Sequence, residues 1–355
     1  MQLLLRILSW PYGWFVGLRN LLYDEHLLHS FEPGLPTICV GNLAVGGTGK
    51  TPHVEYIAMF LHAEGYRVAV LSRGYKRRTV GFVEADEQAT AATIGDEAMQ
   101  LKSKHPELIV AVCEDRLIGI SRLKKRHPDL QVVILDDAFQ HRRLKAGLNI
   151  LLTQADRLYV EDHLLPFGRL REQAIGSIRA NMVVVTKCPP AIQPIEQRLI
   201  DTKLALPPSK PLIFTRMRYL EPVPVFEGVK EKGERSNDIC AGMKVLLLTG
   251  IAQPQYLLEH TRQLGAEVVP LSFSDHHAFS ENDILNIESL FRNHHCDLIL
   301  TTEKDAVRLR ECANIPKQLI PFFYAQPIQV EFLGHDEQTF NNTILDYVRK
   351  STCNR

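Results

Sequence analysis

The sequence predicts an α/β protein whose first part is a parallel sheet covered by helices, followed by a second, smaller α/β domain. Short apolar runs alternate with longer stretches of helical periodicity, which is the pattern of βαβ units. A stretch rich in proline and charge, residues 211–235, interrupts this alternation and predicts a linker. The length of 355 residues suits roughly two domains.

The predicted strands are continuous apolar runs, as expected where both faces of a parallel sheet are buried. In the first domain they span residues 37–40, 67–72, 108–112, 132–136, 149–153 and 182–186. In the second domain they span residues 244–249, 267–271, 297–301 and 319–324. We therefore divide the chain into an N-terminal segment at 1–23, a first domain at 24–212, and a second domain with linker and C-terminal helix at 213–355.

The composition is that of an ordinary globular protein, with 45% hydrophobic and 23% charged residues. Because the formal net charge is +0, we expect no nucleic acid partner. The seven cysteines include no C-x-x-C pair and no zinc-binding spacing, which favours reduced thiols in a cytosol-like compartment. We expect the chain to act as a monomer.

The N-terminal segment, residues 1–23, is dominated by leucine and aromatic side chains and contains both tryptophans, Trp10 and Trp14. Pro11 and Gly13 break the segment, so it is a poor transmembrane helix, and it lacks the small-residue cleavage site of a signal peptide. Aromatic rings and arginines beside an apolar face suit the plane of a membrane interface. We favour docking on a membrane surface, and the alternative is a helix packed on its own domain.

A glycine-rich turn follows the first predicted strand, and a helix is expected to begin at its end. This turn reads Ala44-Val45-Gly46-Gly47-Thr48-Gly49-Lys50-Thr51. In such a P-loop, backbone N–H groups cradle phosphates, Lys50 reaches the β- and γ-phosphates, and the Thr51 hydroxyl holds Mg²⁺. The usual pattern begins with glycine where this chain has Ala44, and Gly46 and Gly47 place the flexibility inside the loop. The order of strand, loop and helix predicts a P-loop NTPase-like first domain, because a plain glycine turn does not explain the spacing of Lys50 and Thr51.

Two acidic residues, Asp136 and Asp137, end the apolar run 132–135 and precede Gln140 and His141. A carboxylate at the end of a hydrophobic strand in a P-loop protein has the Walker-B position, which holds the metal ion. The alternative is a solvated turn. We favour the metal site, because the acidic pair is followed so closely by glutamine and histidine.

A second acidic site and a histidine pair are candidates for proton transfer. Asp96 lies at a predicted helix start, where capping alone could explain a carboxylate, or it acts as the general base of phosphoryl transfer. His276 and His277 follow Asp275 after a strand of the second domain. Adjacent histidines cannot easily share one metal ion, so we expect a histidine paired with a carboxylate. The alternative is a loop that only caps a helix and has no catalytic role.

Basic residues gather in two loops of the first domain. Arg73 and Tyr75 follow the second predicted strand within a basic cluster, and Arg169 and Arg171 lie farther along the chain. In a chain of zero net charge, such local patches favour an anionic substrate or lipid headgroups. The alternative is a pair of solvated loops.

Taken together in their order along the chain, these motifs resemble one family, tetraacyldisaccharide 4′-kinase, the lipid A 4′-kinase of Gram-negative bacteria. The resemblance covers most of the chain. It rests on the aromatic N-terminus with 19–23, and on 40–52, 72–75, 95–97, 135–141, 165–172, 250–254, 275–276 and 302–305. Ala44 stands where the family usually has threonine or serine, and Ala138 where it often has glycine. Neither departure removes a side chain that the chemistry needs.

The resemblance implies transfer of the ATP γ-phosphate to the 4′-hydroxyl of a tetraacyldisaccharide 1-phosphate at the cytoplasmic face of the bacterial inner membrane, by a peripheral enzyme. It implies two α/β/α domains joined by a β-ribbon, with the site in the cleft. Asp96 would be the catalytic base, His276 its partner, and Lys50 a catalytic cation. The other expected roles are phosphate binding by Gly46, Gly47, Thr48, Gly49 and Thr51; substrate binding by Arg73, Tyr75, Gln140, His141 and Arg171; and Mg²⁺ binding by Thr51, Asp136, Asp137 and Glu172.

Two other classes of P-loop protein remain as alternatives. A P-loop ATPase that positions a protein partner at the membrane has a lysine where this chain has Val45. A GTP-binding switch reads guanine with an aspartate in the pattern [NT]-K-x-D. Here Thr186 and Lys187 are followed by Cys188 and Pro189, so that carboxylate is missing. We therefore expect ATP as the nucleotide.

Overall fold

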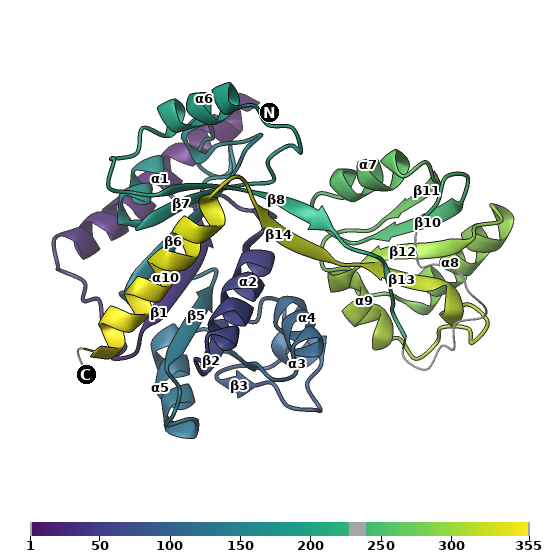
Figure 1. Ribbon diagram of the computed structural model, residues 1–355, viewed down its shortest axis with the longest axis horizontal. Coiled ribbons are helices and arrows are strands. Elements are labelled where there is room, and N and C mark those ends of the chain that lie inside the picture. The colour runs from purple at the N-terminus through teal and green to yellow at the C-terminus, as the bar shows by residue number, and fades with distance from the viewer. Residues whose placement is uncertain (1, 227–238, 354–355) are drawn as a thin grey trace.

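The alternating apolar runs form two sheets, each covered by helices, in a computed structural model that describes residues 2–226 and 239–353 (Figure 1). The larger sheet has the strand order β14-β8-β7-β6-β1-β5-β2-β4-β3. Its strands pair in parallel except β3 and β14, which run antiparallel to their neighbours. They are β1 (Thr37–Asn42), β2 (Val68–Ser72), β3 (Val83–Glu84), β4 (Ile109–Val112), β5 (Val132–Asp136), β6 (Leu148–Gln154), β7 (Met182–Thr186), β8 (Leu212–Tyr219) and β14 (Ile328–Phe332).

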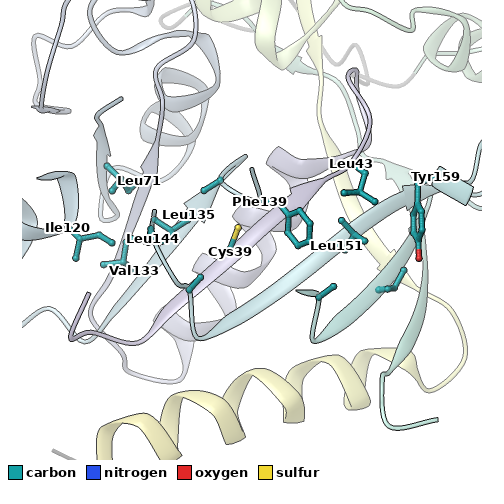
Figure 2. Close-up of a cluster of buried hydrophobic side chains, with 14 of the residues drawn as sticks. Cys39, Leu43, Leu71, Ile120, Val133, Leu135, Phe139, Leu144, Leu151 and Tyr159 are labelled. Carbon is teal, nitrogen blue, oxygen red and sulfur yellow. The ribbon is translucent and has the colours of Figure 1, made fainter. Parts of the chain in front are cut away.

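Helices cover both faces of the larger sheet because its central strands are apolar on both sides. Along β1, Cys39 points into one hydrophobic cluster, whereas Ile38 and Val40 point into the other. Figure 2 shows the first cluster, where Cys39, Phe139 and Leu151 lie close together. The helices around this sheet are α1 (Gln2–Asp24), α2 (Lys50–Ala63), α3 (Ala91–Ile94), α4 (Asp96–Lys104), α5 (Arg116–Arg126), α6 (Pro194–Leu204) and α10 (Asp336–Cys353), with 3₁₀ turns η1 (Tyr159–Glu161) and η2 (Ala174–Arg179).

The smaller lobe is a second α/β unit with the strand order β11-β10-β12-β13-β9. All neighbours in it are parallel except β9, which pairs antiparallel with β13. Its elements are β9 (Val223–Pro224), β10 (Lys244–Thr249), α7 (Gln255–Gln263), β11 (Glu267–Ser272), α8 (Glu281–Asn293), β12 (Leu298–Thr302), α9 (Glu303–Arg310), η3 (Ile320–Phe322) and β13 (Phe323–Gln326). The strands β8 and β14 run side by side from the large lobe to this one (Figure 1).

The structure differs from the predicted elements at three places. The strand expected at 319–324 begins only at Phe323, because Pro321 lies in the 3₁₀ turn η3. The helix α1 continues through Pro11 and Gly13, where a break was expected, and side-chain contacts of Tyr12 and Val16 on either side of Gly13 hold it to the large lobe. Within 211–235, the proline-rich part includes β8 and β9, and residues 227–235 lie outside the described residues.

The C-terminal helix packs on the large lobe, although the sequence grouped it with the second domain. Phe340, Ile344 and Val348 of α10 are fully buried in the same cluster as Ile57 of α2. Strand β14 and helix α10 therefore bring the chain back to the sheet in which it began (Figure 1). Sequence periodicity predicts a helix here but carries no signal for which sheet the helix covers.

Candidate active site

The P-loop connects β1 to α2 at the carboxyl edge of the large sheet, where a parallel sheet places ligands. Its glycines Gly46 and Gly49 have φ angles of 110° and 85°, a region that favours glycine. The segment that contains Arg169 and Arg171 holds the start of the loop, with Val45 N–H donating to the Arg169 carbonyl at 2.8 Å. Strands β1 and β7 hold the middle of the loop: Asn42 Nδ2 donates to Thr48 Oγ1 at 2.9 Å, and Thr186 Oγ1 donates to the Thr48 carbonyl at 2.9 Å. These contacts within the protein fix the shape of the loop.

Two carboxylates face the P-loop lysine from the end of β5. Lys50 Nζ lies 3.8 Å from Asp137 Oδ2, and Arg171 Nη1 donates to the other oxygen of Asp137 at 2.7 Å. Burial disfavours the charged form of Asp137, but these two cations hold its pKa below the usual range. Asp136 is buried, and its Oδ1 has no hydrogen-bond partner among the described residues. Burial, together with the charges of Glu97 and Asp137, raises the pKa of Asp136.

Arg116, at the start of α5, supports this acidic pair and was not among the residues singled out from the sequence. Its buried guanidinium donates to the backbone carbonyls of Cys113, Glu114 and Asp136 at 3.1 to 3.3 Å. A cation below two carboxylates stabilises their ionised forms and fixes the backbone that carries them. No local sequence motif marks such a residue, because its partners are defined by the fold.

The acidic site at Asp96 meets the histidine loop of the small lobe. His276 Nδ1 lies 2.6 Å from Asp96 Oδ2, although 180 residues separate them in the chain. Arg308 of α9 also donates to this oxygen of Asp96. Burial opposes ionisation of Asp96, but hydrogen bonds from His276 and Arg308 hold its pKa well below the usual range.

These contacts bear on the two interpretations of each motif. Asp96 is the first residue of α4 and Gly95 is its N-cap, so Asp96 does not occupy the capping position. The two histidines diverge: His277 Nε2 pairs with Asp283 at 2.9 Å, away from Asp96. Of the two histidines, His276 is the one that contacts the Asp96 carboxylate. The expected pairing of a histidine with a carboxylate is thus present, across the two lobes.

The P-loop, the carboxylates Asp136 and Asp137, and His276 all line one cavity of about 1690 Å³ between the lobes, and Asp96 lies behind His276. Residues of both sheets contribute to its wall. Of the side chains predicted for substrate, phosphate and metal binding, the following line it: Gly46, Gly47, Thr48, Gly49, Lys50, Thr51, Arg73, Tyr75, Asp136, Asp137, Gln140, His141 and Arg171. Burial and the nearby Arg116 lower the pKa of His141, so a neutral imidazole faces this space.

Sequence comparison agrees with this geometry. The chain matches the family model described as Tetraacyldisaccharide-1-P 4'-kinase over residues 1–349. The chain belongs to the tetraacyldisaccharide 4′-kinase family. It is 48% identical to the tetraacyldisaccharide 4'-kinase of Bacteroides fragilis strain YCH46, covering 98% of this chain and 93% of that protein. It is 42% identical to the Flavobacterium johnsoniae enzyme of the same name, covering 98% of each chain.

A solved structure from this kinase family has the same fold. LpxK from Aquifex aeolicus, described as an apo form in complex with ATP, superposes with a TM-score of 0.74 at 29% sequence identity. The match covers 98% of this chain and 99% of that one. The prediction of a P-loop NTPase-like α/β protein of this family is therefore confirmed.

One residue predicted for metal binding in this kinase family lies apart from the cavity. Glu172 is fully buried, and both of its oxygens accept from Arg179 Nη2 at 2.8 and 2.9 Å. Asn20 Nδ2 and Gln140 Nε2 donate to the same carboxylate at 2.8 and 3.0 Å. With its lone pairs used in this way, Glu172 joins α1 to the loop that carries Gln140 instead of facing the P-loop.

Helix α1 has two different faces. On one face, Tyr12 Oη donates to the Arg171 carbonyl at 2.8 Å, Val16 is buried, and Arg19 lines the cavity. On the other face, Trp10 and Trp14 are 79% and 74% exposed. The exposed apolar side chains of this helix are Leu3, Leu4, Ile7, Leu8, Trp10, Trp14, Phe15, Leu18 and Leu21. Among the described helices, none is long and apolar enough to cross a membrane.

Proposed function

We propose that this chain transfers the γ-phosphate of ATP to the 4′-hydroxyl of a tetraacyldisaccharide 1-phosphate. The observation that carries the proposal is that His276, which is paired with Asp96, lines the same cavity as the P-loop. A P-loop alone binds and hydrolyses nucleotides, whereas a paired base beside it can activate an alcohol. The names of the family and of its relatives supply the identity of that alcohol.

The Asp96–His276 pair is the base of the reaction, with the proton passing to the histidine. A carboxylate whose pKa is held low is a weak base, and Asp96 already accepts hydrogen bonds from His276 and Arg308. An imidazole oriented by a carboxylate is a better proton acceptor near neutral pH. The 4′-hydroxyl O–H bond breaks as its proton moves to His276 Nε2. The oxygen bonds to the γ-phosphorus, and the bond from that phosphorus to the β-phosphate bridging oxygen breaks to release ADP.

The P-loop and the cations hold the transferring group. Backbone N–H groups of 46–50 cradle the β- and γ-phosphates, and Lys50 places a positive charge where negative charge develops. Arg171 donates to Asp137, so two cations balance the charge of this carboxylate and Lys50 does not do so alone. Arg73 and Tyr75 line the side of the cavity near His276, with the Tyr75 and His276 ring centroids 5.1 Å apart, and they contact the sugar acceptor.

The residues around the P-loop fit a Mg²⁺ ion. The described residues contain no group of three or more His, Cys, Asp or Glu side chains that could hold a metal by themselves. Mg²⁺ in kinases, however, takes one or two protein oxygens together with substrate phosphates and water. Asp136 offers a buried, unpartnered Oδ1, and Thr51 offers a hydroxyl on the cavity wall. These two residues would hold the ion, which neutralises phosphate charge when bound, and Asp137 lies next to them.

The enzyme works at a membrane surface, on the cytoplasmic face of the inner membrane. The exposed face of α1 is apolar and carries two tryptophans, which suits the headgroup region of a bilayer. The opposite face of α1 reaches the cavity through Tyr12 and Arg19. A lipid acceptor can therefore keep its acyl chains in the bilayer while its sugar enters the cavity.

The decisive experiment incubates the purified protein with ATP, Mg²⁺ and tetraacyldisaccharide 1-phosphate, and locates the added phosphate by mass spectrometry. We expect one new phosphate at the 4′-position. An acceptor lacking the 4′-hydroxyl is the matched control and should remain unchanged. ATP hydrolysis that is unaffected by the lipid, with no phosphorylated lipid, would refute the proposal and favour a P-loop ATPase with a protein partner.

A second experiment tests the membrane surface. Trp10 and Trp14 are the two tryptophans of the chain and both lie on the exposed face of α1, so their fluorescence reports on this face alone. We expect an aqueous quencher to reach them in solution and to lose access when anionic liposomes are added. Equal quenching with and without liposomes would contradict the membrane interpretation.

A further inference from the structure

Helix α9 presents two cations to the imidazole of His276. Lys304 and Arg308 are four residues apart, so they lie on the same face of the helix. Lys304 Nζ lies 3.1 Å from His276 Nε2, and Arg308 donates to Asp96 at the Nδ1 end of the ring. The proposed mechanism uses His276 and Asp96, but it does not explain why a lysine contacts the ring nitrogen that must receive the proton.

The donors around the ring fix its tautomer. A lysine ammonium has donors only, so Nε2 must accept from Lys304, and Nδ1 must then carry the hydrogen and donate to Asp96 Oδ2 at 2.6 Å. Arg308 Nη2 lies 3.2 Å from Nδ1, but two donors cannot bond each other, and both converge on the Asp96 carboxylate. The ring is therefore neutral, with its lone pair on Nε2.

The position of the ammonium is itself fixed. Asp275 Oδ1 accepts from Lys304 Nζ at 2.9 Å, and the Lys304 side chain is only 16% exposed. Both Lys304 and His276 line the cavity. A hydroxyl that enters beside Nε2 would make the same kind of contact as the ammonium, with an O–H donor in place of an N–H donor.

We propose that Lys304 is a positioning residue for the proton acceptor. Its ammonium holds His276 in the neutral Nδ1–H form and keeps the Nε2 lone pair available until the acceptor hydroxyl replaces it. A positive charge beside Nε2 also opposes premature protonation of the ring. This inference rests on the proposed function, since the identity of the incoming hydroxyl comes from there.

A test of this proposal must separate the effect of Lys304 on His276 from the effects of the other charged groups around the ring. Asp96 of α4 lies 2.6 Å from Nδ1, Asp275 Oδ2 lies 3.8 Å from Nε2, and the Lys304 and Arg308 cations lie 3.1 and 3.2 Å from Nε2 and Nδ1. Asp275 pairs with Lys304, and the Tyr75 ring lies against the histidine at 5.1 Å between centroids. Lys76 belongs to the same neighbourhood but donates to the Asp275 carbonyl at 3.3 Å, not to the ring. Lys76 is therefore a matched control for a nearby cation without the Nε2 contact.

The test measures kcat/KM against pH for the wild type and for Lys304→Met, Lys304→Arg and Lys76→Met. With the Lys304 cation removed, His276 should protonate more readily, so the acid limb should move to higher pH by about 1 pH unit. Lys304→Arg should keep the limb near its wild-type position, and Lys76→Met should not move it. A Lys304→Met enzyme that loses rate equally at every pH would show a merely structural role and overturn the proposal.

A second readout needs no activity. A long-range ¹H–¹⁵N spectrum of the full-length wild-type protein, with the His276 signals assigned through His276→Asn, reports which ring nitrogen carries hydrogen. We expect hydrogen on Nδ1 and a lone pair on Nε2, and the reverse tautomer would overturn the proposal even if Lys304→Met failed to fold. A wild-type protein without kinase activity would refute the proposed function, while this spectrum would still decide the Lys304 contact.

Discussion

The variants Asp96→Asn and His276→Asn should both lower kcat, and together they should lose little more than the worse single variant. Both His276 and Arg308 donate to one oxygen of Asp96, and an asparagine oxygen there can still accept, but it carries no negative charge to stabilise the imidazolium that forms when His276 takes the proton. Loss of an oriented general base costs roughly 10²–10⁴-fold in rate, or about 3–5 kcal/mol of activation free energy. Independent effects would multiply to roughly 10⁴–10⁸-fold, whereas residues that act as a unit do not add in this way.

The assay is the phosphorylation of the lipid acceptor at varied ATP and acceptor concentrations, with thermal unfolding measured in parallel. The matched control is Asp283→Asn, because Asp283 pairs with the neighbouring His277 at 2.9 Å and does not line the cavity. It should leave kcat within about twofold of the wild type, as a cap residue remote from the substrate should. An Asp96→Asn enzyme whose only change is a higher KM for ATP would place Asp96 in the nucleotide site and refute the reasoning.

Three further predictions concern the nucleotide and the core beneath it. Lys50→Ala and Thr51→Ala should each abolish turnover while leaving the melting temperature nearly unchanged, and near-normal activity of Lys50→Ala would end the P-loop interpretation. ATP should be preferred over GTP because Pro189 stands where a guanine-reading aspartate would be, and equal kcat/KM for the two nucleotides would contradict this. Burial lowers the pKa of His53 from 6.5 to about 4, so the unfolded chain takes up this proton first as the pH falls below 6.5. The free energy of unfolding should therefore fall as the pH is lowered from 6.5 to 4, by roughly 2 kcal/mol at pH 5. Urea unfolding of His53→Asn should lack this part of the pH dependence.

The parts of the site that could be predicted from sequence are those set by local spacing. The P-loop needs Gly46, Gly49 and Lys50 in one order, because backbone N–H groups and a lysine must converge on phosphate within one turn. Asp136 and Asp137 could be predicted because a buried strand ends directly before them. In both cases the chemistry and the fold depend on the same few consecutive residues.

The residues that sequence reasoning missed act across long separations. Arg116 supports Asp136 from a different strand–helix unit, and Arg308 reaches Asp96 over 212 residues. Glu172 was expected at the metal because it lies in a motif with Arg171, but Arg179 and Asn20 occupy its oxygens. Such partners are set by how the elements pack, and single-sequence patterns carry no information about packing between lobes.

The return of the chain to its first sheet makes the small lobe an insertion within the large one. Tyr219 of β8 and Ile328 of β14 are direct partners, so a short turn between them would in principle excise the whole intervening lobe. The same return of the chain leaves the large lobe incomplete on the ribosome until α10 emerges, since Phe340 and Val348 fill its core. A nascent chain that has made the P-loop therefore still lacks the second half of the cavity and, before α10 is made, a layer of its own core.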